Sequence, residues 1–170
     1  MKWPSKEDRE HWEINQFIHH YERATSEPGL RILSKGERPD YVLVSGSLES
    51  TKYGVELTSV YNDDRSVPDN HIPPQAEVKN ISYLPSDVEN YQIRVLDAIK
   101  TKDKKARGGY STEHPLLLSI YINEYLAIHI TLEEWRTFFK ENNFNIETTV
   151  FKAIVLWPLP DNHEFLLSEV

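Results

Sequence analysis

Two acidic residues lie in neighbouring β-rich segments, at a spacing that could build a site for a hard cation. Asp40 begins the run 40–44, and Glu56 lies inside the run 53–61 between two apolar neighbours. Side chains alternate between the two faces of a strand, so Glu56 projects away from both neighbours. A hairpin between the two runs would bring Asp40 and Glu56 side by side. Two convergent carboxylates suit Mg²⁺ or Mn²⁺, which prefer oxygen ligands, and such a cation polarises a phosphoryl group and acidifies a bound water.

Each of these residues also has a purely structural interpretation. An aspartate in a turn, such as Asp40 after Pro39, often caps its own backbone. Glu56 would be harmless on the solvated face of an edge strand, whereas a buried, unpaired acid is costly. The order and spacing of the pair favour the metal site over two unrelated structural roles.

A basic stretch lies further along this acidic chain. It comprises Lys100, Lys102, Lys104 and Lys105, with Arg94 and Arg107 nearby. These cations could simply complement the dipole at a solvated helix end. They are also the natural place for a phosphate backbone to dock.

Apolar periodicity, caps and turns predict the element order α-β-β-β-α-β-α-β and an α/β fold with a mixed central sheet flanked by helices. The expected elements are a helix capped at Ser5 and ended by residues 27–29, strands over 30–33, 40–44 and 53–61, a helix capped at Ser86 and ended by Gly108-Gly109, a strand over 115–122, a helix capped at Thr131 and a strand over 149–156. Residues 62–85 contain four prolines and no clear period, which indicates a long excursion.

Length and composition indicate one domain over residues 1–170. The formal net charge of −8 argues against a general nucleic-acid coat protein but not against a nuclease with a locally basic surface. The absence of cysteine excludes a disulfide framework and a thiolate zinc site. No apolar leader core or membrane-length run is present, so we expect a cytoplasmic protein that does not enter a membrane.

The motif residues together resemble the PD-(D/E)XK phosphodiesterase superfamily, which has the restriction-endonuclease-like fold. The match consists of Pro39-Asp40 and Glu56-Leu57-Thr58. The last motif position is usually lysine, and Thr58 departs from it. Some branches supply the lysine from the following helix, then show a tyrosine and a leucine-rich strand. The order Lys102, Tyr110 and the strand at Leu116 looks similar to that layout.

The resemblance implies roles for individual residues. Asp40 and Glu56 would ligate Mg²⁺ or Mn²⁺, with the carbonyl of Leu57 as a further ligand. Lys102 would position the attacking water, with Lys105 as the second choice. Glu13, from the first helix, would support the site, with Glu22 as the second choice.

Substrate contacts are expected from Lys105, Arg107 and Thr58. The substrate would be nucleic acid, with DNA favoured over RNA, and homodimers occur in this superfamily. The alternative is a catalytically inactive relative, acting as an immunity-type or accessory module that binds a protein partner. A third possibility is a structural subunit of a larger nucleic-acid machine. Convergence of Asp40, Glu56 and a lysine amine on one place would favour the enzyme.

Overall fold

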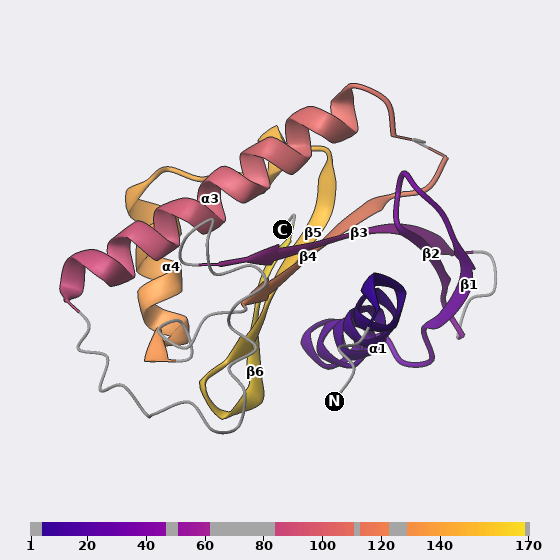
Figure 1. The fold of residues 1–170 in the computed structure, drawn as a ribbon, viewed down its shortest axis with the longest axis horizontal. Coiled ribbons are helices and arrows are strands. Elements are labelled where there is room, and N and C mark those ends of the chain that lie inside the picture. Colours follow the sequence, from indigo (N-terminus) through magenta and orange to yellow (C-terminus); the bar gives the residue numbers. More distant parts are fainter. Residues whose placement is uncertain (1–4, 47–50, 62–83, 111–112, 123–128, 169–170) are drawn as a thin grey trace.

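The structure is a computed structural model that describes residues 5–46, 51–61, 84–110, 113–122 and 129–168. Its centre is a six-stranded mixed sheet with the strands in chain order (Figure 1). The strands are β1 (Arg31–Lys35), β2 (Tyr41–Val44), β3 (Lys52–Val60), β4 (Leu116–Ile122), β5 (Phe151–Leu159) and β6 (His163–Ser168). The pairs β3–β4 and β4–β5 are parallel, and the other neighbouring pairs are antiparallel. The expected mixed sheet is confirmed.

Helices cover both faces of this sheet (Figure 1). Helix α1 (Lys6–Thr25) lies on one face, and α3 (Pro85–Arg107) and α4 (Leu132–Glu141) lie on the other. Parallel neighbours need a crossover between them, and α3 falls between β3 and β4 in the chain while α4 falls between β4 and β5. Two short 3-10 turns, η2 (Ile146–Thr148) and η3 (Pro160–Asn162), flank β5.

The central strands alternate their apolar side chains between two core clusters. On β5, Val155 and Trp157 belong to the cluster under α1, whereas Ile154 and Leu156 belong to the cluster under α3 and α4. All four are at most 1% exposed. Strands that are covered on both faces have nearly continuous apolar sequences, as residues 116–122 of β4 do.

The helix starts follow from their capping residues. Ser5 and Asp8 form a reciprocal capping box at α1, and Thr131 does the same with Glu134 at α4, both as predicted. The prediction for α3 was wrong in detail. Helix α3 begins at Pro85 rather than after Ser86, because proline is preorganised for the first helical position.

A sixth strand was not predicted. The segment 158–162 turns the chain back, with Asp161 and Asn162 at positive φ, a conformation that these two residue types tolerate. Strand β6 then pairs antiparallel with β5, placing His163 opposite Leu159. The expected excursion at 62–85 falls outside the described residues up to position 83.

A polar clamp ties α1 to this added strand. The ring Nδ1–H of His20 donates to Glu164 Oε2 at 2.8 Å, and the Arg23 guanidinium contacts the same carboxylate. The His20 ring also stacks on Trp157, with ring centroids 5.1 Å apart. Burial lowers the pKa of His20. Burial alone would raise the pKa of Glu164, but the hydrogen bonds that Arg23 and His20 donate to this carboxylate lower it overall.

Among the described helices, none is long and apolar enough to cross a membrane.

Candidate metal centre

Pairing of β2 with β3 brings the two predicted acids together. The antiparallel register sets Tyr41 opposite Val55, and continuing it by one position sets Asp40 opposite Glu56. The backbone N–H of Leu57 donates to Asp40 Oδ2 at 2.8 Å, which fixes the aspartate carboxylate against β3. The two acids therefore meet through a local hairpin, as their spacing predicted.

Close packing at Gly54 sets how near the first half of the motif can come to β3. A Cβ at this position would lie 2.7 Å from Pro39 Cγ and 2.8 Å from Leu116 Cδ2, both too close for a real contact. Position 54 of β3 therefore needs glycine, because the ring of Pro39 packs directly against its Cα.

Glu56 is directed into the protein rather than into solvent. Its strand neighbours Val55 and Leu57 belong to the cluster under α1, so Glu56 faces the side of α3. The residue is 3% exposed. The solvated edge-strand interpretation of this acid is therefore excluded, and its burial requires partners.

Lys102, on α3, supplies the counter-charge. Its Nζ lies 2.6 Å from Glu56 Oε1 and 3.2 Å from the carbonyl oxygen of Leu57. Helix α3 is held on the sheet by apolar side chains that include the fully buried Val95 and Ile99. The lysine thus reaches the acid from a helix 46 positions away in sequence.

Tyr110 makes a second contact with the same glutamate oxygen. Its hydroxyl donates to Glu56 Oε1 at 2.6 Å. Helix α3 ends at Arg107 with Gly108 as its C-cap, and the backbone N–H of Tyr110 donates to the carbonyl of Ala106 at 3.1 Å. Burial and the adjacent carboxylate raise the pKa of this phenol, so it remains a proton donor. The sequence placed Tyr110 in the motif layout but gave it no role.

The second carboxylate oxygen of Glu56, Oε2, is the atom that bears on whether a cation binds here. Glu56 Oε2 is buried and has no hydrogen-bond partner among the described residues. Unpartnered buried oxygens are rare and ask for an explanation such as an ion. Glu56 Oε2, the Asp40 carboxylate and the Leu57 carbonyl could offer a cation oxygen donors only, the ligand type that Mg²⁺ and Mn²⁺ prefer. Within the described residues, no group of three or more acidic, histidine or cysteine side chains gathers to hold a metal.

The surroundings of Asp40 raise the pKa of its carboxyl group. Burial raises its pKa from 3.8 to about 6, and the charge of Glu56 adds to this, while the Leu57 N–H and Lys102 act in the opposite direction. A bound cation would favour the charged form of Asp40.

Glu13 lies close enough to Asp40 for their charges to interact, but its hydrogen bond is made with Ser59. Its Oε1 accepts a hydrogen bond from the hydroxyl of Ser59 at 2.6 Å. Burial raises the pKa of Glu13, and the charge of Asp40 contributes to the increase. Glu13 therefore belongs to the electrostatic surroundings of Asp40, and Ser59 is a contact that the sequence did not indicate.

The three predicted substrate contacts differ in their surroundings. Lys105 is exposed one turn beyond Lys102. Arg107 is bound by Asp103 at 2.8 Å and donates to the Thr148 carbonyl at 2.6 Å, so it secures the end of α3. Thr58 is half-buried, two residues beyond Glu56 on the same face of β3.

A small hollow lies against Pro39, the residue before Asp40. Its volume is about 180 Å³, and Pro39 and Gly54 form part of its wall. Arg38 and His114 also line it, and neither was singled out by the sequence patterns. The acidic Glu113 lines it as well, and neither Asp40 nor Glu56 is among its lining residues.

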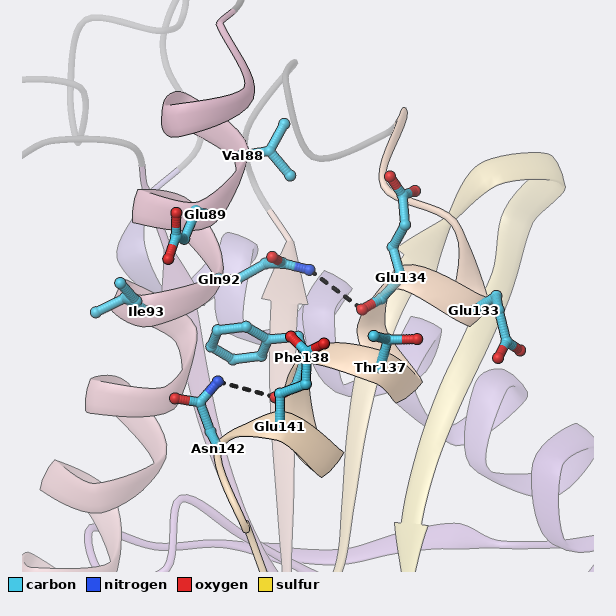
Figure 2. A pocket seen from close by; sticks show the side chains of 10 residues that line it. All are labelled: Val88, Glu89, Gln92, Ile93, Glu133, Glu134, Thr137, Phe138, Glu141 and Asn142. Carbon is cyan, nitrogen blue, oxygen red and sulfur yellow. Dashed lines mark hydrogen bonds between the residues drawn. The ribbon is translucent and has the colours of Figure 1, made fainter.

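A larger hollow of about 500 Å³ lies between α3 and α4 (Figure 2), and neither Asp40 nor Glu56 is among its lining residues. Glutamates surround it from both helices: Glu89, Glu133, Glu134 and Glu141. Its ten lining residues include no lysine, arginine or histidine. A phosphate backbone would be repelled there, so this hollow is not the candidate site.

No protein-family model, no curated protein and no solved structure matches this chain.

Proposed function

We propose that this protein is a Mg²⁺- or Mn²⁺-dependent phosphodiesterase that hydrolyses nucleic acid, with DNA favoured over RNA. The observation that carries the proposal is the convergence of Asp40, Glu56 and Lys102, with one buried glutamate oxygen left unpartnered among the described residues. This is the arrangement expected from the resemblance to the PD-(D/E)XK superfamily. The lysine comes from α3 in place of Thr58.

Each residue has a defined task in this proposal. Asp40, Glu56 Oε2 and the Leu57 carbonyl would hold the cation, which lowers the pKa of a bound water and neutralises charge that develops on the phosphate. Lys102 would donate hydrogen bonds to the attacking water and so orient it toward phosphorus. Attack would form a bond between the water oxygen and phosphorus and break the bond between phosphorus and the leaving sugar oxygen. The proton of the attacking water would pass to solvent, and the leaving oxygen would take up a proton from solvent. Glu13 would add negative charge near Asp40.

The test is calorimetric titration of Mn²⁺ into the wild type and into an Asp40→Ala, Glu56→Ala double variant. Supercoiled plasmid and a single-stranded oligonucleotide are incubated with each protein in parallel. We expect metal binding and metal-dependent cutting by the wild type only. Metal binding without cutting of either nucleic acid would contradict the assigned substrate class. An absence of metal binding by the wild type would overturn the metal centre.

One observation favours a second candidate, a non-catalytic protein-binding module. Lys102 already contacts Glu56 Oε1 and the Leu57 carbonyl, so an internal cation neutralises the centre without a metal. In an inactive relative this ion pair would serve stability alone. The two candidates differ in Lys102→Met: the enzyme would retain Mn²⁺ binding and lose cutting, whereas the inactive module would show neither property before or after the change.

A further inference from the structure

The buried carboxylate of Glu56 has an uneven distribution of partners. Two donors, Lys102 Nζ and the Tyr110 hydroxyl, both lie 2.6 Å from Oε1. The other oxygen, Oε2, has none among the described residues. Hydrogen bonds to an ionised acceptor are strong and directional, so two of them on one oxygen fix the rotation of the carboxylate.

The two donors are not equivalent. The side chain of Lys102 is long and flexible, and its Nζ also donates to the Leu57 carbonyl at 3.2 Å. Under the proposed function it must leave these oxygens to reach a water. Tyr110 has a rigid ring close to the end of α3, where its backbone N–H is bonded to Ala106. It has no second task in the proposed chemistry.

We infer that Tyr110 is a positioning residue of the metal centre: its hydroxyl holds Glu56 Oε1 so that Oε2 stays directed at the cation when Lys102 moves to the water. This inference rests on the proposed function and deepens it. Groups that hydrogen-bond a metal ligand typically change metal affinity by about 10- to 100-fold when removed. Tyr110→Phe removes only the hydroxyl oxygen and keeps the ring.

The experiment is calorimetric titration of Mn²⁺ into the wild type, Tyr110→Phe and a matched control, Tyr91→Phe. Tyr91 is a buried tyrosine on α3, and its hydroxyl donates to the Val60 carbonyl at 2.8 Å. Each variant removes a phenolic hydroxyl that donates a hydrogen bond, to Glu56 in one case and to the Val60 carbonyl in the other. We expect the Mn²⁺ affinity to fall about 10-fold or more in Tyr110→Phe and to remain that of the wild type in Tyr91→Phe.

A metal-free double-mutant cycle supplies an independent arm. The free energy of unfolding is measured for Tyr110→Phe in the wild type and in a Glu56→Gln background. If the hydroxyl acts through the charged carboxylate, its removal costs less stability in the Glu56→Gln protein. Equal costs in the two backgrounds would overturn the inference even if Tyr110→Phe folds too poorly for calorimetry.

The outcomes separate this inference from the proposed function. Wild-type protein that binds no Mn²⁺ would overturn both. Wild-type binding with an unchanged affinity in Tyr110→Phe would overturn the role of Tyr110 alone. Equal losses of affinity in Tyr110→Phe and Tyr91→Phe would assign the effect to general stability and also refute it.

Discussion

Replacing Asp40 by asparagine is predicted to stabilise the metal-free protein while abolishing metal binding. Burial raises the pKa of Asp40 from 3.8 to about 6, so the folded state holds this proton more tightly than the unfolded chain does. The stability that the proton contributes is complete below about pH 4 and is lost as the pH rises through about 6. The asparagine side chain carries no charge at any pH and keeps an oxygen that can accept from the Leu57 N–H.

The size of the effect follows from the pKa shift. A change of about two units corresponds to about 3 kcal/mol at 1.36 kcal/mol per unit. Asp40 is only partly buried, so solvent screening reduces this to about 1–2 kcal/mol at pH 7.5. For a chain of this size the melting temperature should rise by about 2–8 °C at that pH. At pH 4 the two proteins should unfold at nearly the same temperature.

The assay is thermal unfolding of wild type and Asp40→Asn between pH 4 and 8 in chelated buffer, repeated with saturating Mn²⁺. At a free metal concentration of 100 times Kd, the wild type gains about 2.7 kcal/mol and the variant gains nothing, which reverses or cancels their order. A variant less stable than the wild type at pH 7.5 without metal would refute the desolvation argument. An equal metal-induced gain in both proteins would refute the assignment of Asp40 as a ligand.

Three further changes probe the surroundings of the centre. Lys102→Met should lower the free energy of unfolding by about 3 kcal/mol in urea titrations, because it leaves the Glu56 carboxylate buried without its counter-charge; a stability equal to the wild type would contradict the ion pair. Glu164→Gln should cost about 1–2 kcal/mol by weakening the clamp to His20, with unchanged Mn²⁺ affinity as its control. Lys105→Ala should weaken DNA binding in fluorescence anisotropy and reduce the slope of affinity against salt by about 1, and an unchanged slope would exclude a phosphate contact.

The sequence predicted the hairpin that joins Asp40 and Glu56 because antiparallel neighbours close to one another in the chain leave few alternatives. A nearly continuous apolar run over residues 115–122 indicated β4, whose side chains are covered on both faces of the sheet. Strand β6 was missed because its pairing depends on the turn at Asp161 and Asn162, whose positive φ values carry only a weak sequence signal.

The contacts within the site were harder to predict. The helix placed several lysines within a few residues, and only the docking of α3 on the sheet determines that Lys102 reaches Glu56 while Lys105 stays exposed. The roles of Tyr110 and Ser59 depend on tertiary distances that no local pattern encodes. Side-chain periodicity gives the face on which a residue lies but not the atom that it contacts.

The separation of Glu56 and Lys102 onto different elements has a mechanical consequence. A lysine two positions after the acid on one strand would move with it as a single rigid body. Here the 2.6 Å contact between Lys102 and Glu56 crosses the interface at which α3 packs on the sheet. Helix α3 packs on the sheet through residues that include Val95 and Ile99, and small slides of the helix change the distance between acid and amine. Truncating one of these apolar side chains should therefore alter the contact before it unfolds the protein.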